Sequence, residues 1–162
     1  MLVDQTDERC SLYFDRSSAK RFAQSSRMLP ALARLRLYGP LASGPGRVQP
    51  ADVAADHRAE DFTQRAAATS AAEMADLLQD LARLREEPLD LHGIPVIVIS
   101  GTKASALDRT QRTALTASHR ATAEALGARF VEAPHSGHLV MFSEPQLVID
   151  QIVRLLDSAE RG

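Results

Sequence analysis

The sequence predicts an α/β fold: a partial, doubly wound parallel sheet of about three strands with helices around it. The first observation is a continuous run of β-branched residues, Ile94 to Ser100, which lacks polar alternation and suits a strand covered on both faces. The second is the order of elements after residue 91, which reads strand, helix, strand, loop, helix. The third is composition: only 4% of residues are aromatic and tryptophan is absent, which disfavours an all-β sandwich.

Each element of the second half has its own signal. A helix is predicted over 109–126, because Gly127 follows it as the residue type that favours a left-handed C-cap. A second strand is predicted over 129–133. The last helix is predicted over 145–156, with a proline in its first turn. The opening residues 1–4 resemble the end of a further strand that has been cut short.

The first half of the chain, to about residue 90, is mostly helix-forming. One helix is predicted over 18–37, with a kink or break at Pro30. The stretch 38–46 is rich in glycine and proline and predicts a loop between helices. Ser70 and Glu73 have the spacing of a capping box, which predicts the start of an amphipathic helix.

Composition and charge exclude several classes of protein. The length of 162 residues suits one domain, and a formal net charge of −2 gives no reason to expect nucleic acid or an anionic membrane as a partner. No basic leader and no apolar run of about 18 residues is visible, so we expect no signal peptide, no membrane span and a cytoplasmic location.

No cofactor or metal is expected from the sequence. The lone Cys10 cannot form an internal disulfide, and a buried or incidental thiol is the expectation. His57, His92 and His119 have no companion ligands at metal-site spacing, so solvated or capping roles are expected for them. A glycine-rich nucleotide-binding loop is also absent.

Polar residues follow each of the three predicted strands, at 4–7, 101–108 and 135–138. The carboxyl ends of parallel strands share one edge of a sheet, where sites of this fold class form. His138 follows a serine and a glycine just past a strand end, and histidine is the usual general base near neutral pH. A loop histidine bonded to nearby backbone is the alternative reading of the same position.

The stretch from Leu91 to Leu156 resembles the closing segment of the α/β-hydrolase fold. In it, GIPVIVISG is similar to the seventh strand, ARFVEA to the eighth, and HSGHLVMFSEPQLVIDQIVRLL to the histidine loop and final helix. The resemblance covers 1–162 but only the C-terminal half of the family fold, with 15–88 as a helical cap insertion and 89–162 as core strands, histidine loop and final helix. It implies that His138, and not His135, is the catalytic histidine.

Three carboxylates compete for the role of acid partner. Many members of the family carry an aspartate soon after the seventh strand, but the matching residues 101–105 hold none, and Asp108 follows later. Other members place the acid after the sixth strand, where LVDQTDE offers Asp4 or Asp7. The acid must be a buried carboxylate that hydrogen-bonds the second ring nitrogen of the histidine and fixes its tautomer. All three aspartates stay open at this point.

The nucleophile motif of the family, Gly-x-Ser-x-Gly, does not occur in the 162 residues. The resemblance implies an ancestral Ser-His-Asp hydrolase of ester-like small molecules, and we expect this chain alone to be inactive. A small apolar or ester-like substrate is expected if the site is completed. The alternative is a non-catalytic, truncated remnant that acts as an interaction module and self-associates through an exposed sheet edge.

Overall fold

The computed structural model describes residues 1–44, 48–88, 90–106 and 108–159, and the chain divides into two compact units. One unit consists of Met1–Leu12 together with Leu84–Gly162, and the other of Tyr13–Arg83. The first unit carries the sheet. In the second unit, the regular elements of the described residues are helices. A 3-10 helix, Ser11–Phe14, lies where the chain passes from the first unit into the second.

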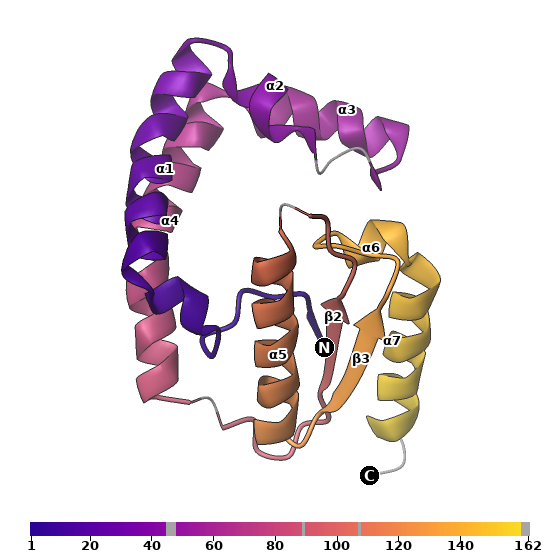
Figure 1. Ribbon diagram of the computed structural model, residues 1–162. Helices are drawn as coiled ribbons and strands as arrows, with labels where there is room; N and C mark the ends of the chain where they lie inside the picture. Colours follow the sequence, from indigo (N-terminus) through magenta and orange to yellow (C-terminus); the bar gives the residue numbers. More distant parts are fainter. Residues whose placement is uncertain (45–47, 89, 107, 160–162) are drawn as a thin grey trace. The chain divides into compact units, whose positions relative to one another are not determined.

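The sheet has three parallel strands in the order β1 (Leu2–Val3), β2 (Ile97–Gly101) and β3 (Arg129–Ala133), which confirms the predicted fold class (Figure 1). β2 lies in the middle, pairs with both neighbours and is buried along its whole length. β2 begins later than predicted. Residues 94–96 precede the strand, where Pro95 has no N–H to contribute; the carbonyl of Val96 accepts the N–H of Arg129 at 3.1 Å, and the residue pairing with β3 starts at Ile97.

Helices cover the sheet from both sides, as a doubly wound fold requires. Figure 1 shows α5 (Arg109–Ala125) and α7 (Pro145–Ala159) on opposite sides of β2 and β3, with the short α6 (Val140–Ser143) before α7. The predicted turn after α5 is confirmed, because Gly127 has a φ of +59°. The 15-residue α7 runs slightly beyond its predicted end.

The core of this unit lies between the sheet and α7. Ile97, Ile99, Ala133 and Val140 are buried together. Partly buried apolar side chains pack against them: Val3, Val131, Leu147, Val148 and Leu155. Each fully buried valine or isoleucine contributes about 1.5–3 kcal/mol. This packing fixes the carboxyl ends of β2 and β3 against each other, and those ends carry the predicted site.

The helical unit corrects two expectations. Its first long helix, α1 (Arg16–Arg34), begins after the N-cap Asp15 and ends before residue 37, with Leu35 as its C-cap. The loop predicted over 38–46 is wrong at its start, because α2 (Tyr38–Ala42) occupies it. Pro40 lies in the first turn of α2, where a missing N–H costs no helix hydrogen bond. Pro45 and Gly46 of the predicted loop lie outside the described residues.

The predicted capping box is also wrong. After α3 (Ala51–Glu60), the next helix, α4 (Gln64–Glu86), begins before Ser70 and Glu73, so both lie inside it. Thr63 supplies the cap instead, since its Oγ1 accepts the N–H of Ala66 at 3.1 Å. The alanines before Ser70 favour helix strongly enough to extend it back to that threonine. None of the helices in the described part of the chain is long and apolar enough to cross a membrane.

Candidate functional site

The structure brings together two of the predicted site residues, Asp4 at the end of β1 and His138 in the loop after β3. Nδ1 of His138 lies 3.0 Å from Oδ2 of Asp4. An ionised carboxylate only accepts hydrogen bonds, so Nδ1 is the donor and Nε2 of the neutral ring keeps its lone pair. The His138 side chain is 70% exposed, whereas that of Asp4 is 1% exposed. The pair therefore joins a buried acid to an accessible imidazole.

Asp4 turns out of the sheet at the last rung of the β1–β2 ladder. Its N–H donates to the carbonyl of Ile99 at 2.7 Å, and its φ of +44° lies in the left-handed region. Aspartate is one of the few residues with a side chain that adopt this conformation readily. The turn brings Oδ1 within 2.9 Å of the N–H of Gly101, the last residue of β2.

A buried arginine completes the surroundings of the acid. Nη1 of Arg112, near the start of α5, lies 2.7 Å and 2.8 Å from the two carboxylate oxygens of Asp4. The same atom donates to the carbonyl of Gly101 at 3.1 Å. A carboxylate removed from water is tolerated when opposite charge and hydrogen bonds compensate it. Asp4 has both.

The histidine loop is held by a glutamate from the start of the last helix. Oε1 of Glu144 accepts the N–H of His135 at 2.9 Å and the hydroxyl of Ser136 at 2.7 Å. From the other side, the N–H of Lys103 donates to the carbonyl of Ser136 at 3.0 Å. His135 thus contributes its backbone to the loop, and His138 contributes its side chain to the pair.

Gly101 allows the acid and the histidine loop to approach each other. A Cβ at this position would lie 1.9 Å from the carbonyl oxygen of Gly137, which is far inside van der Waals contact. Its N–H and carbonyl are both used at the site, by Asp4 and Arg112. Any side chain here would displace the backbone next to His138.

The charges of the pair reinforce each other. Burial alone raises the pKa of Asp4, but hydrogen bonds from His138 and Arg112, the charge of Arg112 and the N–H of Gly101 outweigh it, so the pKa is lowered. The hydrogen bond to Asp4 raises the pKa of His138, against desolvation and the repulsion of Arg112. The imidazole is therefore a stronger base than an isolated histidine.

The other two candidate acids are engaged elsewhere. Asp7 is fully buried and accepts the hydroxyl of Thr122 at 2.7 Å and the N–H of Arg9 at 2.8 Å. Asp108 accepts the hydroxyl of Ser105 at 2.7 Å, a local contact before α5. Among the three aspartates, Asp4 is the one that hydrogen-bonds His138.

Sequence reasoning missed the role of α5. The expectation that His119 is solvated or capping is wrong, because it is completely buried and hydrogen-bonded at both ring nitrogens. Arg112 was not singled out. A signal was present: Arg112, His119 and Thr122 share the helical spacing of the buried Leu115 and Ala123, so polar side chains lie on the inner face of α5.

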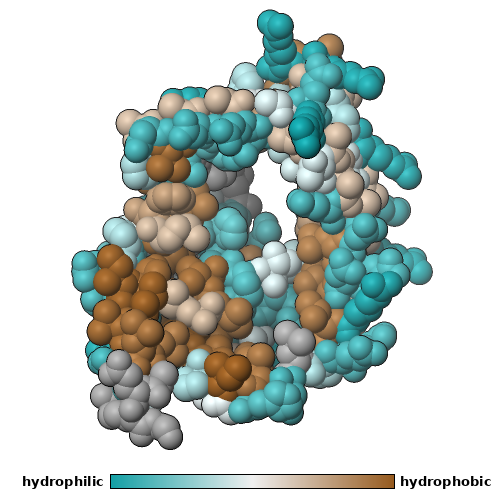
Figure 2. All heavy atoms as spheres, turned by 180° about the vertical axis from the view of Figure 1, so that it is seen from behind, coloured by the Kyte–Doolittle hydropathy of each residue, from teal (hydrophilic) through white to brown (hydrophobic). Residues whose placement is uncertain are grey.

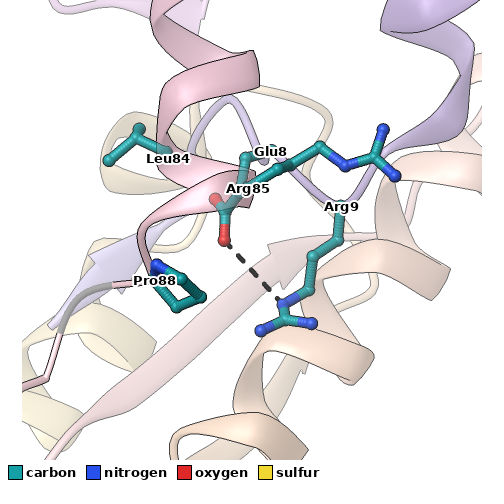
Figure 3. Close-up of a pocket in the computed structure, with 5 residues that line it drawn as sticks. All are labelled: Glu8, Arg9, Leu84, Arg85 and Pro88. Atoms are coloured by element: carbon teal, nitrogen blue, oxygen red, sulfur yellow. Dashed lines mark ion pairs between the residues drawn. The ribbon is translucent and has the colours of Figure 1, made fainter.

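Two depressions on the sheet-bearing unit do not contain the pair. One, of about 370 Å³, has Arg112, Thr116 and Arg120 in its wall. The other, of about 330 Å³, is lined by Glu8, Arg9, Leu84, Arg85 and Pro88, with an ion pair of 3.8 Å between Arg9 and Glu8 (Figure 3). Neither is lined by Asp4 or His138.

Comparison with known proteins decides the family. A family model described as "Alpha/beta hydrolase family" matches residues 9–151, which is most of the chain. The chain belongs to the alpha/beta hydrolase family. No curated protein and no solved structure shows a significant match to it.

The residues that the family model matches belong to both compact units of this hydrolase-family chain. It includes His138 and the whole of α5, and it begins after Asp4. In the part of the chain that the structure describes, no group of three or more His, Cys, Asp or Glu side chains is arranged to hold a metal ion. At the strand ends of this hydrolase-family chain, the structure brings together the side chains of an acid–histidine pair, Asp4 and His138.

We predict that Gly101→Ala lowers the free energy of unfolding by more than about 3 kcal/mol, because the backbone of β2 or of the histidine loop must move. Chemical denaturation measures the change. Gly137→Ala is the matched control, since a Cβ there meets only the Lys103 carbonyl oxygen at an ordinary 3.9 Å. Equal stabilities of the two variants would contradict the close approach.

We predict that Asp4→Asn lowers the pKa of His138, because the carboxylate is the main cause of its elevation. An NMR titration of the His138 ring measures this. Asp108→Asn is the control and leaves the titration unchanged, since Asp108 bonds Ser105. A His138 titration that is identical in Asp4→Asn and the parent chain would show that the pair does not form in solution.

The same pair makes stability depend on pH in two ways. The raised pKa of His138 gives stability that is fully present below its unfolded-state pKa and lost as the pH rises through the folded-state value. The lowered pKa of Asp4 gives stability present above its unfolded-state pKa and lost as the pH falls through the folded-state value. Asp4→Asn removes both dependences, which unfolding curves across the pH range measure.

Proposed function

We propose that this chain provides the acid and the base of a hydrolase site, with Asp4 as the acid and His138 as the general base. The observation that carries the proposal is the 3.0 Å contact between Nδ1 of His138 and Asp4, which leaves Nε2 with a lone pair on an exposed ring. Family membership supports hydrolysis as the class of reaction. The proposed substrate is a small apolar or ester-like molecule.

In this mechanism Nε2 of His138 removes the proton from the attacking hydroxyl group and later gives it to the leaving group. Asp4 holds the ring in the Nδ1–H tautomer and stabilises the imidazolium that forms. Arg112 keeps Asp4 ionised, because its charge lowers the pKa of the carboxyl group. The helical residues 15–88 are proposed as the cap insertion of the family fold.

The nucleophile is the part of the site that the sequence does not supply in the usual family form, since Gly-x-Ser-x-Gly is absent from the 162 residues. Oxyanion donors and an activated serine are large contributors to acyl transfer. We therefore propose that the 162-residue chain is inactive as a serine hydrolase and retains only the basicity of His138.

Two measurements on the purified chain test this. A serine-directed fluorophosphonate probe should not label it. Slow cleavage of an activated aryl ester should depend on His138, and His138→Ala should reduce the rate constant by about 100-fold, the small end of what general-base catalysis contributes. In Asp4→Asn, the pH profile of the remaining cleavage should move to lower pH, because the pKa of His138 falls.

His135→Ala is the matched control for ester cleavage. It removes an exposed imidazole from the same loop, while the backbone N–H that binds Glu144 is kept. The rate should stay within about twofold of the parent. Fluorophosphonate labelling that His138→Ala abolishes would overturn the proposed inactivity, and a rate that is insensitive to His138→Ala would overturn the proposed base.

A non-catalytic role in self-association is the second candidate, and an exposed apolar stripe on α7 favours it. Four side chains at helical spacing on its outer side are each at least 41% exposed: Ile149, Ile152, Val153 and Leu156. Figure 2 shows apolar surface gathered over this helix. β1 is an edge strand, and a net charge of −2 gives little repulsion between copies. We propose a second copy of the chain as the partner.

Sedimentation equilibrium tests this candidate. Val153→Gln should weaken dimerisation by at least about tenfold, since burying one valine contributes about 1.5 kcal/mol. Arg154→Gln, at the neighbouring exposed position, is the control and should leave the association unchanged. A chain that remains monomeric at high micromolar concentration would rule the candidate out.

A further inference from the structure

A row of polar side chains on the inner face of α5 contacts the segment that carries the acid. Arg112 bonds the carboxylate of Asp4, Nε2 of His119 lies 2.8 Å from the carbonyl oxygen of Gln5, and the hydroxyl of Thr122 donates to Asp7 at 2.7 Å. The three α5 residues are all buried. One helix therefore contacts this segment at three points, in the order of the chain.

The hydrogen bonds of His119 define its tautomer. A backbone carbonyl only accepts, so Nε2 carries the proton that is shared with Gln5. Nδ1 lies 2.9 Å from the hydroxyl of Ser100, which is able to donate to it. His119 and Ser100 are both completely buried. The Nε2–H of His119 is therefore directed at the carbonyl oxygen of Gln5.

In this geometry, groups other than His119 compensate the negative charge of the Asp4 carboxylate. Nδ1 of His119 is 3.9 Å from Oδ1 of Asp4, which is beyond hydrogen-bond distance, so no hydrogen bond joins them. The charged and titratable groups that face the Asp4 carboxylate within hydrogen-bond distance are Arg112 and His138. His119 acts on the backbone beside Asp4.

The backbone at that point needs support. Asp4 has a φ of +44°, a left-handed conformation that aspartate adopts more readily than most residues but that still costs free energy in a residue with a side chain, so contacts on both sides of it help to hold the turn. On one side, its N–H is fixed by the carbonyl of Ile99 at 2.7 Å. On the other side, the next residue is fixed through its carbonyl by His119. The two anchors bracket the left-handed residue.

We propose that His119 is a positioning residue for the Asp4–His138 pair: by fixing the carbonyl of Gln5, it holds the backbone turn that aims the Asp4 carboxylate at Nδ1 of His138. The inference rests on the proposed function of this pair. It adds a buried residue that touches neither a substrate nor the reacting atoms.

Two substitutions separate this role from a general contribution to stability. In His119→Gln, the amide nitrogen reaches the position of Nε2 and donates to Gln5, while the acceptor for Ser100 is lost. In His119→Asn, the shorter side chain reaches only the position of Nδ1, so the Ser100 contact is kept and the Gln5 contact is lost. Both replacements are amides in the same buried place, and both should lower the free energy of unfolding.

The pKa of His138, followed by NMR titration of the 162-residue chain, is the readout. It should stay raised in His119→Gln and fall in His119→Asn. Ser100→Ala, which removes only the partner of Nδ1, should leave it raised. In the parent chain, the nitrogen chemical shifts of the His119 ring should show a proton on Nε2 and none on Nδ1.

A His138 pKa that stays raised in His119→Asn, or that falls equally in both amide variants, would overturn the proposal. If His119→Asn does not fold, a fall in Ser100→Ala or an unprotonated Nε2 in the parent would overturn it instead. Failure of the proposed function has a different signature. In that case Asp4→Asn itself leaves the His138 titration unchanged, whatever the His119 variants do.

Discussion

The organisation of this protein depends on one buried negative charge. The Asp4 carboxylate is almost completely removed from water, and an ionised group in that position is stable only with full compensation. Its partners come from three places: the N–H of Gly101 from β2, the guanidinium of Arg112 from α5, and Nδ1 of His138 from the loop after β3. The acid therefore ties together the ends of the strands and the helix that covers them.

The last residues of β2 serve both sides of the site at once. Gly101, the last residue of β2, binds the acid through its N–H and Arg112 through its carbonyl, and Lys103, two residues past the strand, donates its N–H to the carbonyl of Ser136 in the histidine loop. Gly101 and Lys103 make all these contacts with backbone atoms, whereas Asp4 and Arg112 use side-chain atoms. The spacing between acid and histidine is thus set by the parallel ladder itself, which fixes β2 against its neighbours before any side chain is considered. An acid–histidine pair that is built this way is held in place without a bound substrate.

The sequence predicts the sheet better than the site. Strand β2 and helix α5 carry clear local signals, a β-branched run and a helix closed by Gly127, and β3 lies where expected. His138 stands out because a glycine and a strand end precede it. The choice among the acids could not be made, because it depends on how the segment after β1 turns against α5, and that contact joins residues about 110 positions apart. The early start of α4 was missed for a local reason: alanine propensity outweighs a capping pattern.

The brevity of β1 gives the pair a limited lifetime. This strand has two residues and a neighbour on one side only, so it belongs to the part of a fold that opens locally more often than the core does. Each opening carries Asp4 away from His138, and the imidazole then behaves as a solitary ring until the strand closes again. Protonation of His138 and closure of β1 are consequently coupled, and each favours the other to the same extent. The amide of Asp4, bonded to Ile99, exchanges with solvent only through that opening, so its protection reports how long the acid stays with its base.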